Sequence, residues 1–351
     1  MTKLNKYLLA TFDYELFLGK RSGLVNECLI EPTNKILSVL NPLNIQGIFF
    51  IDTAYLLQLE KHSQYTRVKN DLIAVRTQLI QLVKDGHFIF PHIHPHWNSA
   101  IYNGQNNQWD LSDNHNYTIS TLNEHEQELI FSDCISYLKD IVKEAGGIQI
   151  IDSYRAGGWS LQPFQVFKKH FIEHNIKNDF SVLPGVYHFS KAQTFDYSNC
   201  DKKTPYQFND SVCEENNQGS FSEFPISITK LSKKELFRHK MTTKFHAKWK
   251  KDSSFGRGIG QAAELTDKQP KSPDGFQLST FNEYLSMDFL SKAKLNNYLD
   301  FCINQEFVHF LSHPKLCTNH SIQTFKDLLT ILTADFNVLS NYNEIKQHYI
   351  K

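Results

Sequence analysis

The chain of 351 residues lacks several features that would assign it to a specialised class of protein. It contains no apolar stretch near the roughly 18 residues that a membrane-spanning helix requires. Its 37 Lys and Arg residues equal its 37 Asp and Glu residues, so no overall charge favours a nucleic acid partner. Its six cysteines include no CxxC pair, and the sequence has no repeat of fixed period. These absences argue against a membrane-spanning protein, a nucleic-acid-binding protein and a thiolate metal site.

The beginning of the chain, MTKLNKYLLATFDYE, gives an expectation about the compartment. Its apolar run is short and has no cleavage pattern of small residues, so we expect no signal peptide. Without a secretory signal, reduced cysteines and a cytoplasmic location are the simpler expectation. The cysteines are Cys28, Cys134, Cys200, Cys213, Cys302 and Cys317.

What the sequence does have is apolar material, 40% hydrophobic and 13% aromatic residues, which suffices for a large core. Strand and helix patterns alternate along the chain, which favours an α/β fold with a parallel sheet covered by helices. Strands are predicted over 7–13, 47–52, 87–92, 148–155, 178–185, 221–229 and 307–314. Helices are predicted over 32–40, 65–84, 121–144, 164–174, 282–306 and 325–332, the third starting with a capping box of Thr121 and Glu124.

Polar side chains collect where the predicted strands end. Asp13 and Glu15 follow the first strand, the histidine segment at 92–96 follows the third, Arg155 ends the fourth and His313 ends the last. In a barrel of parallel strands, the carboxyl ends of the strands carry the active site. We therefore expect these side chains to lie close together.

The segment PHIHPHW, residues 91–97, has three histidines at alternate positions, His92, His94 and His96. A catalytic zinc ion takes three nitrogen or oxygen ligands and leaves one position for water. His92 and His96 can face one point if the chain turns between them, which Pro95 favours; in an extended chain all three would share one face. A polar loop that is merely rich in imidazole is the alternative interpretation.

Five segments, in order over about residues 7–314, resemble motifs of the polysaccharide deacetylase (NodB-homology) superfamily, the carbohydrate esterase family 4-like enzymes. GHFIFPHIHPHW resembles its histidine motif, and LLATFDYE its acidic motif. GIFFID resembles its second strand, SYRAGGWS its arginine motif and FLSHP its final histidine motif. The resemblance implies one domain over 1–351, a distorted (β/α) barrel of about seven parallel strands, with a basic insertion at about 230–280. It also implies a hydrolase with a divalent metal, expected to be zinc.

The resemblance further implies the roles of individual residues. Glu15, His92 and His96 would bind the metal. Asp13 would act as the base, Arg155 would orient Asp13, and His313 would protonate the leaving amine. His94, Trp97 and Trp159 would contact the substrate.

Two departures from the family pattern leave alternatives open. The family commonly has two adjacent aspartates, whereas this chain has Asp13, Tyr14 and Glu15, so Asp13 rather than Glu15 could be the metal ligand. Ile93 replaces the usual Ser or Thr, and the HxHPHW form resembles branches that act on smaller substrates. We expect removal of an N-acyl group, such as acetyl, from a sugar or a lipid- or nucleotide-linked sugar in surface glycan synthesis. The alternatives are a hydrolase of a small non-sugar amide or ureide, and an inactive carbohydrate-binding homologue.

Residues 233–251 form a basic segment with eight Lys or Arg and one acidic residue. Phe237, Met241, Phe245 and Trp249 recur every four residues, which predicts a helix with these side chains roughly on one side. The helix could pack this side on the barrel, bind a phosphate-bearing carrier, or lie on the inner face of the membrane as a peripheral contact. The nearby FGRGIG lacks the context of a phosphate loop and is interpreted as a flexible loop.

Overall fold

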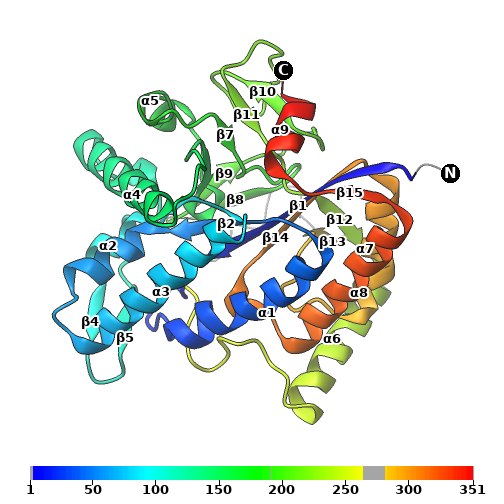
Figure 1. Ribbon diagram of the computed structural model, residues 1–351, viewed down its shortest axis with the longest axis horizontal. Helices are drawn as coiled ribbons and strands as arrows, with labels where there is room; N and C mark the ends of the chain where they lie inside the picture. Colours follow the sequence, from blue (N-terminus) through cyan, green and yellow to red (C-terminus); the bar gives the residue numbers. More distant parts are fainter. Residues whose placement is uncertain (1–2, 191, 264–280, 351) are drawn as a thin grey trace.

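Parallel strands form a curled sheet at the centre of the molecule (Figure 1). The computed structural model describes residues 3–190, 192–263 and 281–350. In spatial order the sheet contains β10 (Tyr206–Phe208), β11 (Phe221–Glu223), β7 (Asn178–Asp179), β6 (Ser153–Ala156), β3 (Phe88–Ile93), β2 (Gly47–Asp52), β1 (Asn5–Tyr14) and β14 (Phe307–Ser312). A further strand, β15 (Asn337–Leu339), pairs with the beginning of β1. Every pair of neighbours in this sheet is parallel except β10 and β11.

The predicted α/β class is confirmed, but the prediction of a barrel of about seven strands is wrong in count and closure. Eight strands follow one another in the row, and its two edges, β10 and β14, are not paired with each other in the described part of the chain. β11 ends at Glu223, and Pro225, which has no backbone N–H to donate, follows two residues later. Isolated hydrogen bonds join β14 to the segments next to it. The N–H of Ser227, between β11 and β12, donates to the carbonyl of His309 (3.1 Å), and the N–H of Leu311 donates to the carbonyl of Leu285, just after β13 (3.0 Å).

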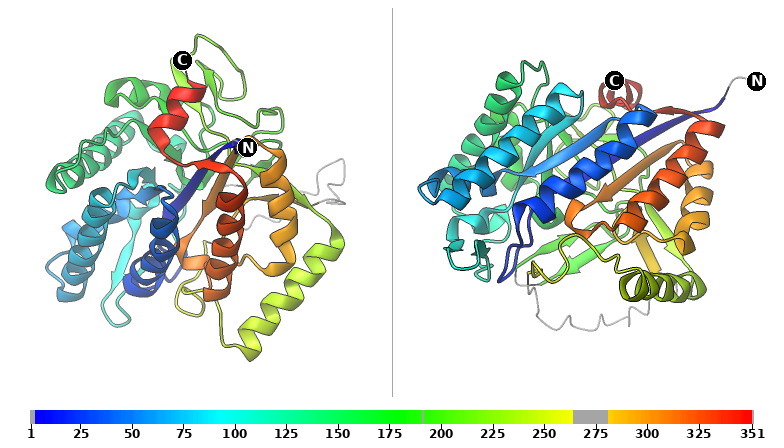
Figure 2. Two further views of the ribbon diagram at one scale, coloured as in Figure 1. Left: turned by 45° about the vertical axis from the view of Figure 1, so that its right-hand side comes forward. Right: turned by 60° about the horizontal axis from the view of Figure 1, so that its bottom comes forward.

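Helices cover the outside of the curled sheet (Figure 2). They are α1 (Glu31–Leu40), α2 (Thr53–Lys61), α3 (Thr66–Lys84), α4 (Glu124–Glu144), α5 (Gln165–His174), α6 (Lys233–Trp249), α7 (Lys292–Asn304), α8 (Asn319–Asp335) and α9 (Tyr342–Tyr349). Three short ribbons pair β4 (Ile101–Asn103) with β5 (Gln108–Asp110), β8 (Tyr187–Phe189) with β9 (Thr194–Asp196), and β12 (Ile228–Leu231) with β13 (Phe281–Tyr284).

Several predicted boundaries differ from the observed ones. The predicted helix over 282–306 is wrong in its first part, because residues 281–284 pair with β12 and α7 begins only at Lys292. The predicted strand over 148–155 is shorter, since β6 begins at Ser153. The capping box of α4 consists of Asn123 and Glu126, two residues after the predicted pair. Part of the predicted basic insertion, residues 264–280, lies outside the described residues.

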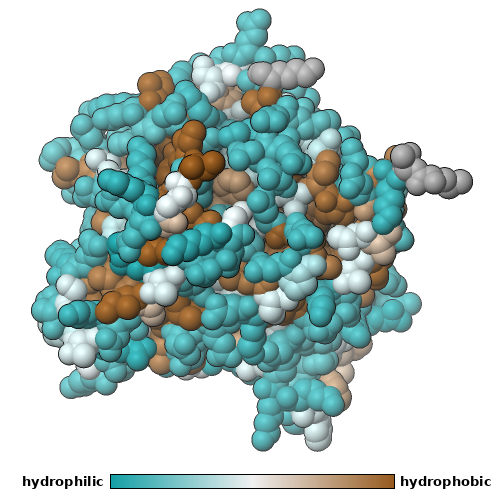
Figure 3. All heavy atoms as spheres, in the orientation of Figure 1, coloured by the Kyte–Doolittle hydropathy of each residue, from teal (hydrophilic) through white to brown (hydrophobic). Residues whose placement is uncertain are grey.

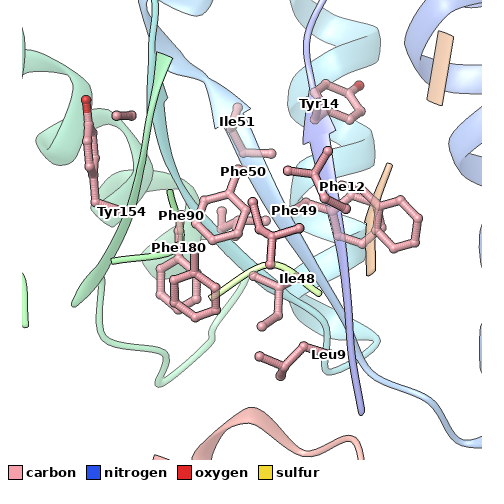
Figure 4. Packing of buried hydrophobic residues seen from close by; sticks show 14 of the residues in the cluster. Leu9, Phe12, Tyr14, Ile48, Phe49, Phe50, Ile51, Phe90, Tyr154 and Phe180 are labelled. Atoms are coloured by element: carbon pink, nitrogen blue, oxygen red, sulfur yellow. The ribbon is translucent and has the colours of Figure 1, made fainter. Parts of the chain in front are cut away.

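Aromatic side chains fill both faces of the central strands. Phe50 of β2 lies near Phe90 and Phe180, with ring centroids 6.1 and 5.1 Å away, while Phe12 and Phe49 stack 5.0 Å apart (Figure 4). All six residues of β2 are buried. A strand buried on both faces reads as a continuous apolar run, which is why GIFFID predicts this strand so clearly.

Helix α9 covers the end of the sheet at which the strands begin. Tyr342 packs edge-on against Phe88 and Phe90 at the beginning of β3, with ring centroids 5.5 and 5.6 Å apart. Its hydroxyl lies 2.7 Å from the hydroxyl of Ser153, the first residue of β6. The functional residues at the carboxyl ends of the strands therefore lie at the end away from α9.

The expectation that all cysteines are reduced is wrong for one pair. Cys200 and Cys213 form a disulfide across a sequence separation of 13 residues, whereas the other four cysteines are free and buried. Disulfides persist mainly in oxidising compartments, so the thiols no longer support the expected cytoplasmic location. Within the described ranges, no helix combines the length and the apolar character that crossing a bilayer requires.

Candidate functional site

Three buried side chains from the ends of two strands, β1 and β3, which flank β2, converge on one point. Oε2 of Glu15 lies 3.0 Å from Nε2 of His94 and 3.4 Å from Nε2 of His92, and the two imidazole nitrogens are 3.1 Å apart. Glu15 follows β1, while His92 is the penultimate residue of β3 and His94 comes directly after this strand. Two imidazoles and a carboxylate are a donor set that suits zinc. These three residues could therefore hold a metal ion.

The polar atoms of this cluster fit a metal better than they fit hydrogen bonding. Within the described part of the chain, Oε2 of Glu15 is buried and has no hydrogen-bond partner. Oε1 of Glu15 is held by Nζ of Lys315 at 2.8 Å, which fixes the carboxylate and leaves Oε2 facing the histidines. Ligand atoms about 2.0–2.2 Å from a tetrahedral zinc ion lie about 3.3–3.6 Å apart, close to the spacing observed here.

His94 occupies the place near Glu15 that the sequence analysis assigned to His96. The chain is still extended at His94 (φ −109°, ψ 95°), and the helical turn Pro95–Ser99 begins only after it. His92 and His94 therefore present their rings on one face, as alternate residues of an extended chain do. His96 lies beyond the turn, is 0% exposed and packs against Tyr117 with ring centroids 4.9 Å apart.

Both ring nitrogens of His96 are buried without a hydrogen-bond partner among the described residues. Burial lowers the pKa of His96 to about 3, and the neighbouring His94 adds to this effect, so the ring is neutral. His94 is seated against Gly157, where a Cβ atom would lie 2.4 Å from the carbonyl oxygen of Ile93 and 3.0 Å from Nδ1 of His94. The glycine of the SYRAGGWS segment thus makes room for the histidine segment.

Arg155 and Asp13 form a fully buried ion pair beside the cluster. Nη1 of Arg155 donates to Oδ1 of Asp13 at 2.5 Å, and the guanidinium lies over the ring of Phe50, 4.1 Å from its centroid. The other donors of Arg155 bond the carbonyl of Phe180 at 3.0 Å and the hydroxyl of Thr11 at 2.8 Å. Oδ2 of Asp13 remains directed at the cluster, 3.9 Å from Nε2 of His92.

His313 faces the same point from β14. Its Nδ1 lies 2.7 Å from Oδ2 of Asp288, and its Nε2 lies 3.6 Å from Oδ2 of Asp13 and 3.8 Å from Oε1 of Glu15. The backbone N–H of His313 donates to the second oxygen of Asp288 at 2.7 Å. Asp288 therefore orients the ring so that Nε2 points into the site.

The charges of the site oppose the effect of burial. Burial alone would raise the pKa of Asp13, but Arg155 holds it below its usual value. Burial would likewise raise the pKa of Glu15, which Lys315 and the neighbouring histidines hold well below its usual value. Burial would lower the pKa of His313, and Asp288 more than offsets this, so that this pKa is raised. Both carboxylates are ionised near neutral pH, and His313 is poised to carry a proton.

The two tryptophans that were expected to contact substrate have different surroundings. Trp97 is 0% exposed; its indole N–H donates to Asp52 at 2.5 Å and its ring packs against Tyr55. This placement corrects the expectation for Trp97, because the ring belongs to the core. Trp159 is partly buried and has a left-handed backbone (φ 57°), which is uncommon for a bulky residue and often marks a functional site.

The site contains residues that the sequence reasoning missed. Asp288 precedes α7 in a stretch that the prediction assigned to a helix, and Lys315 follows the predicted His313 by two residues. His309 lies within β14, where its Nε2 is 3.1 Å from Nη2 of Arg155 and burial lowers its pKa to about 3. Only Lys315 had a usable signal, because it continues the FLSHP segment.

Comparisons with known proteins give similarity in fold only. No family model and no curated protein sequence matches the chain. A provisionally assigned polysaccharide deacetylase from Mycobacterium smegmatis is 12% identical, with a TM-score of 0.49 over 99% of this chain and 91% of that one. An allantoinase is 10% identical (TM-score 0.47, 97% and 89%), and a 4-alpha-glucanotransferase from Thermococcus litoralis is 11% identical (TM-score 0.45, 99% and 41%). Such distant likenesses leave the activity to be argued from the site.

Proposed function

We propose that the protein is a metal-dependent hydrolase that cleaves a C–N bond, removing an N-acyl group from a sugar or sugar-linked substrate. The observation that carries the proposal is the convergence of Glu15, His92 and His94 beside a carboxylate, Asp13, and an imidazole, His313. A metal site flanked by a base and an acid is the arrangement that amide hydrolysis requires.

Glu15, His92 and His94 would hold the metal, with zinc favoured by their two nitrogen donors and one oxygen donor. A divalent ion at this position would polarise the acyl oxygen and lower the pKa of water. Nδ1 of His92 lies 3.0 Å from the carbonyl oxygen of Arg155, so its N–H can donate there and leave Nε2 as the free donor atom. Lys315 would keep Glu15 ionised and fixed.

Asp13 would act as the general base. Its Oδ1 is occupied by Arg155, whereas Oδ2 faces the cluster and can accept the proton of the attacking water. The low pKa of Asp13 keeps this side chain ionised. The hydrogen bonds of Arg155 to Phe180 and Thr11 fix the guanidinium and so limit the movement of Asp13. The alternative, with Asp13 as a metal ligand, has less support because its Oδ2 lies 3.9 Å from Nε2 of His92, whereas Oε2 of Glu15 lies 3.4 and 3.0 Å from the two imidazoles.

His313 would act as the general acid. With Nδ1 bonded to Asp288, its Nε2 faces Oδ2 of Asp13 at 3.6 Å, on the same side of the cluster. Asp288 raises the pKa of His313, so the ring carries a proton near neutral pH and can deliver it to the leaving amine.

The burial of the site bears on the substrate. Asp13, Glu15, His92, His94 and His313 are each at most 9% exposed, so only a small group such as an acetyl can reach them without movement of the chain. Trp159, from the SYRAGGWS segment, is a candidate for stacking on a sugar ring outside the cluster. The same burial also suits the second candidate, a small cyclic amide or ureide that enters the site whole.

Product analysis on purified protein loaded with zinc tests the proposal. The substrates are N-acetylglucosamine oligomers, a lipid-linked and a nucleotide-linked N-acetylated sugar, and allantoin, and the readout is release of acetate or ring opening. Release of acetate from a sugar supports the proposal, and ring opening alone supports the second candidate. Retention of sugar binding with no hydrolysis of any C–N bond would contradict both and indicate a binding protein. His92→Ala should abolish the activity, which distinguishes hydrolysis by this protein from hydrolysis by a contaminating enzyme.

A further inference from the structure

Helix α6 is attached to the molecule by its polar side. The residues of its partly buried face are Glu235, Leu236, His239, Thr242, Thr243, His246 and Ala247. His239 bonds the hydroxyl of Ser291 at 2.9 Å, and His246 stacks on His320 of α8 with ring centroids 3.7 Å apart. No residue of α6 is fully buried. The helix therefore docks mainly through polar and small side chains, with Leu236 as the one large apolar residue of this face, in contrast to an ordinary surface helix.

The opposite side of α6 carries its large apolar side chains. Phe237 is 66% exposed, Met241 55%, Phe245 49% and Trp249 69%. Residues four apart on a helix are offset by about 40°, because each residue advances by roughly 100°. The four side chains therefore form a stripe that winds gradually around the outward half of the helix. The expectation that this side could pack on the barrel is therefore wrong, because the barrel side of α6 is occupied by other residues.

Cations share this outward half with the apolar stripe. By the same helical spacing they alternate with the aromatic residues instead of forming a separate face. They are Lys233, Lys234, Arg238, Lys240, Lys244 and Lys248, and Lys250 and Lys251 follow the helix. Glu235 lies on the docked side, where it caps the helix through the backbone N–H of Ser232. The face seen in Figure 3 is predominantly hydrophilic, including its lower end, near which Figure 1 places α6.

We infer that α6 is a docking surface for an anionic lipid membrane. The occupant follows from the two properties together: exposed Phe and Trp side chains insert at the level of the headgroups, and interspersed lysines bind lipid phosphates. An acidic protein would match the charge but not a stripe of four exposed apolar side chains, and a single-stranded nucleic acid, whose bases can stack on Phe and Trp, is tested directly by the RNA competitor below. The inference concerns binding alone and does not depend on the proposed hydrolysis.

The chain after α6 connects this surface to the site. Phe255 and Gly256 donate backbone hydrogen bonds to the carbonyls of Cys317 and Lys315, both at 3.0 Å. Lys315 in turn holds Glu15. Only a few residues separate Trp249 from these contacts, so the α6 surface is linked along the chain to Lys315 and, through Lys315, to Glu15.

Vesicle binding by the full-length protein tests the inference. The protein is sedimented with vesicles of phosphatidylglycerol and phosphatidylcholine, with vesicles of phosphatidylcholine alone, and with a 20-nucleotide RNA as competitor. We expect binding to the anionic vesicles only, at least tenfold weaker in 0.5 M salt. Trp97 and Trp109 are already buried, so a blue shift of fluorescence on binding should arise chiefly from Trp249 and disappear in Trp249→Phe.

Matched variants assign the binding to α6. Phe245→Ser with Trp249→Ser, and separately Lys240→Glu with Lys244→Glu, should each weaken vesicle binding at least tenfold. The same changes at exposed positions elsewhere, Ile148→Ser with Ile150→Ser and Lys139→Glu with Lys143→Glu, should leave binding unchanged. The inference is overturned if anionic vesicles do not sediment the protein, if the α6 variants bind as well as the controls, or if RNA displaces the vesicles completely.

Discussion

Nη1 of Arg155 lies 2.5 Å from Oδ1 of Asp13, and both side chains are buried. This pair joins the end of β6 to the end of β1, across the positions of β2 and β3. It occupies one oxygen of Asp13 and leaves the other to face His92 and His313. The proposed base is thus ionised and oriented by a residue that need not touch the substrate.

Replacing Arg155 by Lys should lower kcat by about 100-fold or more, because an ammonium cannot bond Asp13, Thr11 and Phe180 together. The pKa of Asp13 should rise, so the acid limb of the pH–rate profile should move to higher pH. The metal content should not change. Loss of the metal in this variant would show that Arg155 supports the cluster and not the base.

Replacing Asp288 by Asn should move the alkaline limb of the profile. Burial lowers the pKa of His313, and Asp288 is the main group that raises it. A general acid acts only while protonated, so activity is lost as the pH rises through this pKa. Without the carboxylate the limb should move to lower pH by about one unit. Asp300→Asn, on the exposed side of α7, is the control; equal profiles for both variants would remove His313 from the acid role.

His87 should contribute a pH-dependent part of the stability. Its Nδ1 accepts the N–H of Gly47 at 3.0 Å, and burial lowers its pKa to about 4 from 6.5. The contribution is therefore present above pH 6.5 and is lost as the pH falls towards 4, by about 3 kcal/mol at most. Urea unfolding at pH 7 and pH 5 should show a smaller decrease in His87→Asn than in the wild type. His125→Asn, an exposed control, should behave like the wild type.

The disulfide should be detectable chemically. A peptide joining Cys200 to Cys213 should appear in a non-reducing digest and disappear on reduction. Replacing both cysteines by Ala should lower the free energy of unfolding by about 2–3 kcal/mol, given the short loop between them. Cys134→Ser is no suitable control because it is buried in the core, so the reduced wild type serves instead. Six titratable thiols in the protein denatured without a reductant would contradict the pairing, which leaves four.

The sequence could predict the strand ends because each is a buried apolar run followed by a polar residue. Asp13, His92, Arg155 and His313 were found in this way, and the structure brings them to one end of the sheet. Glu15 was found as well, since it follows the same strand.

Other parts depend on tertiary structure. The place where the chain turns decides between His94 and His96. Pro95 favours an extended backbone at His94, but whether the turn after it brings His96 back towards Glu15 depends on packing, here against Tyr117. Asp288 has no local signal, because its role arises from its contact with a strand that follows α7. The outward orientation of α6 could not be predicted either, since a helical stripe of apolar residues is equally consistent with docking inward.

Metal analysis of three proteins tests the central claim most directly. The wild type, His94→Ala and His96→Ala are purified in parallel, dialysed against zinc and analysed for bound metal, with circular dichroism to verify folding. The account predicts about one zinc ion per chain in the wild type and in His96→Ala, and a loss of at least tenfold in zinc affinity in His94→Ala. Zinc binding that survives in His94→Ala and is lost in His96→Ala would contradict the proposed cluster of Glu15, His92 and His94.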